Sequence, residues 1–591
     1  MKIVQSLIAQ LQAGRGAPFA GHVVHHHSVH LPSPTPKRLT MPETASAATH
    51  AAPTAHVDTF ARDHLPPREL WPVLDLSGVP HLAALPHINA AAELLDATAA
   101  AGHADRPALV AADVRWSYAE LTERANRIAA VLVRDMGLVP GERVLLRGFN
   151  GPMMFAAWFG VLKAGGIVVA TMPLLRAREL SAIIDKARVR LALCDARLAA
   201  ELETAAHASP TLQRTLTFGG DDGALERAMG GVPSHFDNVR TSAEDVAIIA
   251  FTSGTTGQPK GTMHFHRDLL ASADTFSARV LKPEPDDLFC GSPPLAFTYG
   301  LGGYAMFPMR VGAATLMLEQ ASPPQLLQGM QEFRATVCFT APTAYRAMAG
   351  MVKDFDLAAL RKCVSAGEPL PAATFEAWRA ATGLSIIDGI GSTEMLHIFI
   401  SAAGEDVRAG STGRAVPGYR ARVVDDDGKE VEPGTMGRLM VQGPTGCRYL
   451  DDPERQKAYV QGGWNVTGDT YVMDGEGYFW YRARNDDMII SAGYNIAGPE
   501  VENCLLEHPA VLECAVVGAP DEQRGQVVKA FIVLREGYSA GDEMVKTLQD
   551  HAKQSIAPYK YPRRVEFVAS LPRTQTGKLQ RFRLRQQEAG G

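Results

Sequence analysis

Residues 245–266, DVAIIAFTSGTTGQPKGTMHFH, form the most informative stretch of the chain. Residues 246–251 are an unbroken apolar run, which predicts a buried strand. The loop that follows, residues 252–261, carries four Ser or Thr hydroxyls, three glycines and Lys260. Hydroxyl groups, exposed backbone N–H groups and an ammonium group together suit a polyphosphate. The loop is not a Walker A motif, because Gly261 rather than Ser or Thr follows the lysine. A surface turn rich in glycine and hydroxyl residues is the alternative interpretation.

On both sides of this loop, apolar runs alternate with helical stretches from about residue 108 onward, which predicts βαβ units and a mainly parallel sheet. The longest apolar stretch, residues 155–175, has Lys163 near its centre and a Gly-Gly pair after it. A charge at that place disfavours a membrane span, so we expect a buried helix through Leu162 and a buried strand at residues 167–171.

The domain organisation is inferred from changes in the sequence pattern along the chain. After about residue 410, strands and turns become closely spaced, and the Asp-Gly pair in ARVVDDDGKEV is typical of a hairpin. The predicted fold class is α/β, with a large N-terminal domain of mainly parallel sheets and a small β-rich subdomain, plus a smaller α+β C-terminal domain. The predicted bounds are 1–55 for a disordered extension, 56–485 for the N-terminal domain, about 410–485 for its β-rich subdomain, and 486–591 for the C-terminal domain.

The composition is that of a globular protein and excludes several classes. With 591 residues, 46% hydrophobic and 21% charged, the chain is neither fibrous nor wholly disordered. Its 58 Lys and Arg against 64 Asp and Glu give a net charge of −6, so no global basic field would hold nucleic acid or an anionic membrane. The seven cysteines show no paired spacing, which favours a reducing cytoplasm and no disulfide framework.

The first 55 residues are rich in Ala, His, Pro, Ser and Thr and carry no sustained apolar period, so we expect them to be disordered. The opening MKIVQSLIAQLQ is too polar for a secretion signal, and translation starting at Met41 is an alternative. The histidines between residues 22 and 30 are interpreted as part of a polar tail, with metal binding as the weaker alternative. His264 and His266, two residues apart, are assigned no metal.

Further polar segments, most of them containing glycine, follow the phosphate-binding loop. They are SAGEP (365–369), DGIGSTE (388–394), TGD (467–469), RNDD (484–487), SAGYNI (491–496) and PRTQTGK (572–578). Taken singly, Glu394 would be a solvated cap, Asp469 a turn residue, Asp486 a surface acid and Lys578 an exposed charge.

Taken together and in this order, these segments resemble the adenylate-forming superfamily of acyl-CoA synthetases, luciferases and nonribosomal adenylation domains, over roughly residues 90–582. The resemblance implies that the phosphates of ATP are bound by Thr252, Ser253, Gly254, Thr255, Thr256, Gly257 and Lys260. It implies that the rest of the nucleotide site is formed by Gly367, Glu368, Pro369, Asp388, Gly389, Ile390, Gly391, Asp469 and Arg484. Ile390 replaces the family's usual aromatic residue, so adenine must pack there on an aliphatic side chain or stack elsewhere.

The same resemblance implies the catalytic roles. Thr393 would bond the α-phosphate, and Glu394 would hold Mg²⁺, for which a carboxylate is a suitable ligand. Lys578 would enter the site to stabilise the negative charge of the first half-reaction and then withdraw. Asp486 would be the hinge of a mobile C-terminal domain, and Gly493 would line the tunnel of an incoming thiol.

Within the superfamily, GIGSTEMLHIFIS (389–401) is most similar to benzoate-CoA and 2-aminobenzoate-CoA ligases. By this resemblance Phe297, Tyr299 and Gly300 would form the wall of an aromatic pocket, and His397 would lie near the substrate carboxylate or an ortho amine. Phe297 and Tyr299 as core aromatics, and His397 as a structural histidine, are equally open interpretations.

The implied reaction joins a carboxylic acid to ATP as acyl-AMP, with Mg²⁺, and then transfers the acyl group to coenzyme A. Adenylation for a separate carrier protein, a medium-chain acyl-CoA synthetase and a non-catalytic nucleotide sensor are the alternatives. The expected partners are ATP, coenzyme A and a small carboxylic acid, without nucleic acid or membrane, in a cytoplasmic protein with homodimerisation as an open alternative.

Overall fold

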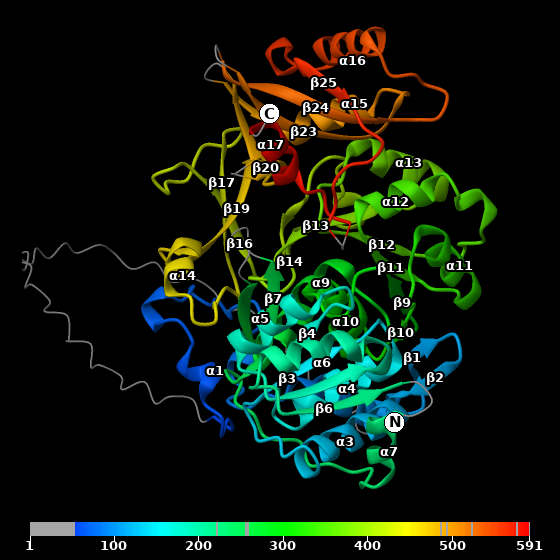
Figure 1. The fold of residues 1–591 in the computed structure, drawn as a ribbon, viewed down its shortest axis with the longest axis vertical. Helices are drawn as coiled ribbons and strands as arrows, with labels where there is room; N and C mark the ends of the chain where they lie inside the picture. Colours follow the sequence, from blue (N-terminus) through cyan, green and yellow to red (C-terminus); the bar gives the residue numbers. More distant parts are fainter. Residues whose placement is uncertain are drawn as a thin grey trace, which may run out of the picture. The chain divides into compact units, whose positions relative to one another are not determined.

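The computed structural model describes residues 54–219, 223–253, 259–484, 487–491, 494–521, 524–574 and 577–589 (Figure 1). The predicted extension up to residue 53 therefore lies outside the described residues. Its last two positions are ordered against the body, because the hydroxyl of Thr54 and the backbone N–H of Ala55 both donate to the carboxylate of Asp245.

A six-stranded sheet carries the phosphate-binding loop. Its order is β6 (Arg214–Phe218), β5 (Leu191–Asp195), β3 (Arg143–Arg147), β4 (Ile167–Thr171), β7 (Val246–Ser253) and β8 (Pro259–Phe265). All neighbours are parallel except β7 and β8. Alternate residues of β3 and β4 pack on opposite faces, against α4 (Pro152–Lys163) on one and against α5 (Ala177–Ala187) and α6 (Ala199–Ala208) on the other. This is the layered α/β arrangement that the alternating sequence pattern predicts.

A nine-stranded sheet carries the segments at 365–369 and 388–394. Its order is β15 (Arg414–Ala415), β14 (Ile398–Ser401), β13 (Ile386–Gly391), β12 (Lys362–Ser365), β11 (Val337–Thr340), β9 (Leu288–Gly291), β10 (Ala314–Leu316), β1 (Pro107–Ala111) and β2 (Val114–Ser117). The strands from β13 to β1 are parallel, and antiparallel strands flank them at both ends. The connecting helices include α11 (Pro323–Phe333), α12 (Pro342–Ala349) and α13 (Ala372–Thr382).

The apolar stretch at 155–175 folds as predicted, into α4 and β4. Gly160 lets α4 approach α3 (Tyr118–Arg134) closely, since a Cβ there would lie 2.7 Å from Ile128 Cγ2. Lys163 is fully buried, and its Nζ lies 2.6 Å from Oδ1 of Asp96, which compensates the buried charge. Among the described residues, no helix has the length and apolar character needed to cross a bilayer.

Two further sheets follow, both largely antiparallel. The first contains β16 (Arg420–Val424), β17 (Met436–Gln442), β18 (Val460–Gln461), β19 (Trp464–Met473) and β20 (Phe479–Arg484). The second contains β21 (Met488–Ser491), β22 (Tyr494–Ala497), β23 (Val511–Asp521), β24 (Gly525–Leu534) and the parallel β25 (Arg564–Phe567). The helices α15 (Gly498–Leu506), α16 (Asp542–Ser555) and α17 (Arg581–Ala589) accompany the second sheet.

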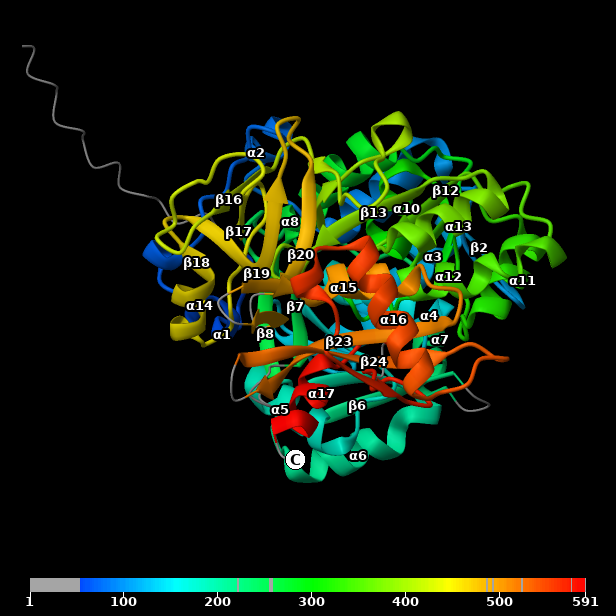
Figure 2. The same ribbon diagram turned by 90° about the horizontal axis from the view of Figure 1, so that it is seen from above.

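The predicted fold class is confirmed: mixed parallel sheets with helices form a large N-terminal domain, and an α+β unit forms a smaller C-terminal domain. Figure 2 shows β23, β24 and α16 close together, and α15 contacts both α13 and β20 of the large domain. The remaining short helices are α1 (Phe60–Asp63), α2 (Pro80–Ala83), α7 (Ala224–Gly230), α8 (His266–Ser272), α9 (Thr298–Leu301), α10 (Phe307–Val311) and α14 (Pro453–Tyr459).

Candidate functional site

The predicted phosphate loop joins β7 to β8 as an antiparallel pair. The strand register sets Thr252 opposite Lys260, so both half-buried side chains stand at the mouth of the loop. Ser253 ends β7. The loop residues Gly254, Thr255, Thr256 and Gly257 lie outside the described residues, and their assignment stays a prediction. The two strands thus bring a hydroxyl and an ammonium group to one place, as polyphosphate binding requires.

Thr393 and Glu394 lie in the turn after β13, and two buried side chains hold this dipeptide. His264 Nε2 lies 2.7 Å from the carbonyl oxygen of Thr393, and the Tyr449 hydroxyl donates to Oε1 of Glu394 at 2.7 Å. Because the carbonyl only accepts, His264 must carry its proton on Nε2. Burial raises the pKa of Tyr449, so its phenol is protonated and acts as the donor.

The segment that contains Tyr449 is bound along β8. The backbone N–H of Met263 donates to the carbonyl of Arg448, and that of Leu450 donates to the carbonyl of Gly261, both at 2.8 Å. These bonds set Tyr449 opposite Thr262, two residues after Lys260. One strand therefore fixes both the end of the phosphate loop and the side chain that contacts Glu394.

A buried ion pair lies behind this arrangement. Arg448 Nη1 is 2.8 Å from Oδ2 of Asp268, and both side chains are fully shielded from solvent. The Arg448 guanidinium also lies 3.9 Å from the ring centre of Phe265. Burial alone would raise the pKa of Asp268, but Arg448, His264 and the backbone N–H of Phe265 together outweigh it and lower the value to about 2.

Sequence reasoning missed Tyr449, Asp268 and Arg448, and it considered His264 only as a metal ligand, a role it did not assign. No spacing rule marks these residues, because they meet Thr393 and Glu394 only through the fold. The one local signal is Asp268 at the first turn of a helix, where it accepts a hydrogen bond from the backbone N–H of Phe265 at 3.0 Å. That pattern indicates an ordinary helix cap and hides the ion pair.

The segments at 365–369 and 388–394 lie side by side, because β12 pairs with β13 so that Ser365 faces Asp388. Gly367 has φ +90° and is exposed, as are Pro369 and Gly391, whereas Gly389 is buried. Glu368 is half-buried and faces Arg573 of the C-terminal domain, with Oε1 3.7 Å from Nη1. Ile390 packs half-buried against the main core, which limits the area it offers to an adenine ring.

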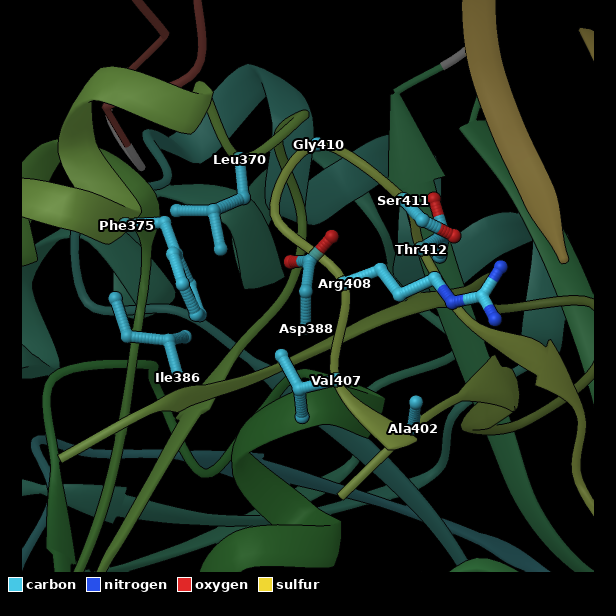
Figure 3. A pocket seen from close by; sticks show the side chains of 10 residues that line it. All are labelled: Leu370, Phe375, Ile386, Asp388, Ala402, Val407, Arg408, Gly410, Ser411 and Thr412. Carbon is cyan, nitrogen blue, oxygen red and sulfur yellow. The ribbon is translucent and has the colours of Figure 1, made fainter. Parts of the chain in front are cut away.

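Asp388 is a half-buried acid of this region. Figure 3 shows its carboxyl group pointing into a small pocket, with Leu370 and Phe375 on one side and Arg408 and Thr412 on the other. Its Oδ1 is buried and has no hydrogen-bond partner among the described residues. Burial raises the pKa of Asp388 to about 7.

This shift predicts a pH dependence of stability. The folded protein holds a proton on Asp388 that the unfolded chain, with a pKa of about 3.9, releases. Stability should therefore fall as the pH rises from about 4 to about 7. Asp388→Asn should lack this part of the fall, as measured by urea unfolding at pH 5, 6 and 8. Asp237→Asn, at an exposed position, is the control, and identical pH profiles for Asp388→Asn and wild type would contradict the assignment.

Asp469 and Arg484 are paired across β19 and β20. The register sets them opposite each other, and Arg484 Nη1 lies 3.6 Å from Oδ1 of Asp469. Gly468, which precedes Asp469 on β19, has φ +78°, a backbone conformation that favours glycine. A Cβ at this position would also lie 3.2 Å from Nη2 of Arg484. The hairpin thus presents a carboxylate and a guanidinium together, as the predicted ribose and nucleotide contacts require.

Lys578 reaches this region from the C-terminal domain. Its Cε lies 3.6 Å from the place of a Cβ on Gly367. Although part of the side chain is open to solvent, burial of the ammonium lowers the pKa of Lys578, and Arg484 lowers it further. The nearby carboxylates of Glu368, Glu394 and Asp469 oppose that shift. Lys578 and four other predicted site residues from distant segments, Glu368, Glu394, Asp469 and Arg484, are therefore brought within electrostatic reach of one another.

The lysine loop is held by its own contacts. Arg573 Nη1 donates to the carbonyl of Gly577 at 2.7 Å, and the Lys578 backbone N–H donates to Oγ1 of Thr574 at 3.0 Å. Arg573 also lies 2.9 Å from Glu513. Since Arg573 faces Glu368 as well, one guanidinium connects the lysine loop to the segment at 365–369.

Two of the predicted pocket residues, Tyr299 and His397, lie in a cluster of aromatic rings. The His397 ring centre is 4.5 Å from that of Phe307 and 5.7 Å from that of Tyr299. Burial lowers the pKa of His397 to about 3, so the ring is neutral near pH 7. Gly302 makes room for it, since a Cβ there would lie 2.3 Å from His397 Nε2. The neutral imidazole of His397 therefore cannot form an ion pair with a substrate carboxylate.

The remaining predicted pocket residues lie at the start of α9. Phe297 precedes this helix and is half-buried, and Gly300 is buried within it. The Tyr299 hydroxyl lies 3.1 Å from the carbonyl of Val364 and 3.2 Å from that of Thr340. These bonds connect Tyr299 to the sheet below the segment at 365–369. The predicted hinge Asp486 and the predicted tunnel residue Gly493 lie outside the described residues.

Comparison with known proteins gives consistent similarities. The sequence model of the family described as AMP-binding enzyme matches residues 96–448, and that of the AMP-binding enzyme C-terminal domain matches residues 500–578. Benzoate–CoA ligase of Thauera aromatica is 37% identical over 521 residues, which cover 87% of this chain and 99% of that protein.

Two solved structures are similar over nearly their whole length. The anthranilate CoA ligase AuaEII in complex with anthranoyl-AMP superposes with a TM-score of 0.82 and 35% identity, covering 86% of this chain and 98% of that one. A benzoate CoA ligase from Burkholderia xenovorans LB400 superposes with a TM-score of 0.77 and 32% identity, covering 84% and 99%.

Proposed function

The chain belongs to the AMP-binding enzyme family, and from that premise we propose that it is an ATP-dependent ligase of an aromatic carboxylic acid and coenzyme A. The acid, benzoate or 2-aminobenzoate by similarity to the relatives named above, reacts with ATP to give acyl-AMP and pyrophosphate. The thiol of coenzyme A then displaces AMP to give the thioester. The observation that carries the proposal is the position of Lys578, whose ammonium lies within electrostatic range of carboxylates of three separate segments.

Activation is needed because a carboxylate resists nucleophiles, and attachment to phosphorus converts one of its oxygens into a leaving group. In our proposal Thr252, Lys260 and the loop between them bind the β- and γ-phosphates, and Thr393 bonds the α-phosphate. Asp469 accepts hydrogen bonds from the ribose hydroxyls, for which a carboxylate has the required lone pairs. Asp388, Ile390 and the segment at 365–369 surround the base. Placement and charge neutralisation then supply most of the rate.

The donor set suits Mg²⁺ bound mainly through the phosphates of the nucleotide. Among the described residues, no group of three or more His, Cys, Asp or Glu side chains is arranged to hold a metal ion. Glu394 provides one hard oxygen ligand of the kind that Mg²⁺ accepts beside phosphates. Bound there, Mg²⁺ would neutralise phosphate charge. Lys578 adds a second positive charge between the attacking carboxylate and the α-phosphate.

For the second half-reaction, we propose that residues 486–591 turn about Asp486, which withdraws Lys578 and brings Gly493 beside the thiol path. The Arg573 contact with Glu368 would then open, since these residues belong to different domains. Phe297, Tyr299, Gly300 and His397 are proposed to surround the aromatic ring of the acid. We also propose a cytoplasmic location, which agrees with the seven free, buried cysteines. Homodimerisation is the remaining part of the proposal and can be measured by light scattering.

The test is a substrate panel of benzoate, 2-aminobenzoate, hydroxybenzoates and hexanoate, with pyrophosphate release measured at each acid concentration. We expect an aromatic acid to exceed hexanoate in kcat/KM by about tenfold or more. Thioester formation with added coenzyme A separates this proposal from adenylation for a carrier protein. If no acid releases pyrophosphate, the protein is a nucleotide sensor and the proposal is wrong.

A further inference from the structure

The Glu394 carboxylate is held by a phenol. Tyr449 donates from its hydroxyl to Oε1 of Glu394 at 2.7 Å, although 55 residues separate the two along the chain. The Tyr449 side chain is only 2% exposed. This contact has no place in the roles proposed above, where Glu394 acts as a ligand and Tyr449 has no function.

The hydroxyl cannot easily move away from the carboxylate. The backbone on both sides of Tyr449 is bound to β8, and its own N–H donates to Oε1 of Gln456 at 2.9 Å. The ring packs edge-on against Tyr459 at a centroid distance of 5.8 Å. Fixed at backbone and ring, the phenol offers a donor at one place, and a rigid donor of this kind orients the group it contacts.

Occupation of Oε1 changes how Glu394 can bind a cation. A carboxylate with one oxygen committed to a short hydrogen bond presents the other oxygen to the metal. Mg²⁺ demands near-octahedral geometry with single oxygen atoms at each position, whereas the larger Ca²⁺ readily takes both oxygens of one carboxylate. The bond from Tyr449 therefore favours the small cation.

We propose that Tyr449 is a positioning residue that restricts Glu394 to binding the nucleotide-associated cation through one oxygen, and thereby selects Mg²⁺ over Ca²⁺. The inference rests on the proposed function, because it assumes that Glu394 meets the cation carried by ATP. It goes further in assigning the choice of metal to a residue outside the predicted motifs. The proposal can be tested by removing the Tyr449 hydroxyl alone, which leaves the shape of the site unchanged.

The test compares Tyr449→Phe with wild type by thermal unfolding in the presence of saturating ATP and increasing Mg²⁺ or Ca²⁺. For Tyr449→Phe, we expect the Mg²⁺ concentration that gives half of the stabilisation to rise about tenfold, as for other residues that orient metal ligands. The Ca²⁺ concentration should stay the same or fall. Tyr459→Phe, which removes the hydroxyl of a neighbouring half-buried tyrosine 3.4 Å from Oγ of Ser392, is the matched control and should keep the wild-type ratio.

The outcomes separate the two proposals. If wild type is not stabilised by ATP with Mg²⁺, the proposed function fails. If wild type is stabilised and Tyr449→Phe has the same Mg²⁺ to Ca²⁺ ratio, the role of Tyr449 is wrong. If Tyr449→Phe loses stabilisation by ATP in the presence of EDTA as well, the residue is only structural and the proposal is again wrong.

A second variant covers a failure of Tyr449→Phe to fold. Glu394→Asp keeps the charge but withdraws the carboxylate from the hydroxyl by one methylene group. We expect it to lose the discrimination between Mg²⁺ and Ca²⁺ in the same direction. Unchanged discrimination in Glu394→Asp would overturn the proposal.

Discussion

Replacing Lys578 by alanine is expected to slow acyl-AMP formation by about 10²- to 10³-fold, the usual effect of removing one preorganised charge from a transition state. Thioester formation from supplied acyl-AMP should change only a few-fold. The reason is the placement of the ammonium beside Gly367, with Glu368, Glu394 and Asp469 around it. These groups belong to the site of the first half-reaction, and the thiol needs the space that Lys578 occupies.

The measurement is pyrophosphate release with acid and ATP, followed separately by thioester formation from synthetic acyl-AMP and coenzyme A. Lys546→Ala is the matched control, because Lys546 lies on α16 of the same domain, is 78% exposed and pairs with Asp550 in the next turn. It should leave both half-reactions unchanged. Equal losses in the two half-reactions of Lys578→Ala would show that the lysine acts through the fold rather than at the reacting atoms.

Much of the local structure can be predicted from the sequence, because burial imposes a period on it. The helix and strand within residues 155–175 and the helix at 542–555 follow from apolar spacing and from glycine or charge at their ends. The order of the sheets cannot be predicted in this way. β1 pairs with β10 across more than 200 residues, and no local pattern encodes that pairing.

The residues of the candidate site also fall into two groups, those that the sequence predicts and those that it does not. Lys260, Glu394, Asp469 and Lys578 lie in short motifs whose order along the chain resembles that of the adenylate-forming superfamily, and this resemblance makes them predictable. The residues that orient these side chains do not lie in such motifs. Tyr449 occurs in the irregular segment between β17 and α14, and His264 occurs in a strand. Each contacts its partner only because β8 runs past the turn at 392–395. Supporting contacts of this kind depend on tertiary packing, which sequence spacing does not reveal.

Asp268→Asn is expected to lower the free energy of unfolding by about 3 to 5 kcal/mol, because it leaves the fully buried Arg448 without a counter-ion. The amide keeps the size of the side chain but not its charge. The neighbours cannot replace that charge, since Nε and Nη2 of Arg448 have no hydrogen-bond partner among the described residues. The phenyl ring of Phe265 offers only a weak cation–π contact.

The pH dependence gives the prediction a second readout. The pKa of Asp268 is about 2 in the folded protein and about 3.9 in an unfolded chain. Its stabilising contribution is therefore present above pH 4 and is lost as the pH falls towards 2. Asp268→Asn should lack this part of the acid transition, as measured by urea unfolding at pH 3, 4 and 7.

The control is the double variant Asp268→Asn with Arg448→Met, which removes both charges and keeps an unbranched side chain against Phe265. A buried ion pair that is replaced as a whole costs little, whereas a broken pair is expensive, so most of the lost stability should return. Strictly additive losses would mean that the two residues act independently, contrary to their 2.8 Å contact. Because Arg448 immediately precedes Tyr449, Asp268→Asn should also weaken the hydrogen bond from Tyr449 to Glu394. The double variant tests whether the charge or the packing of Arg448 maintains this hydrogen bond.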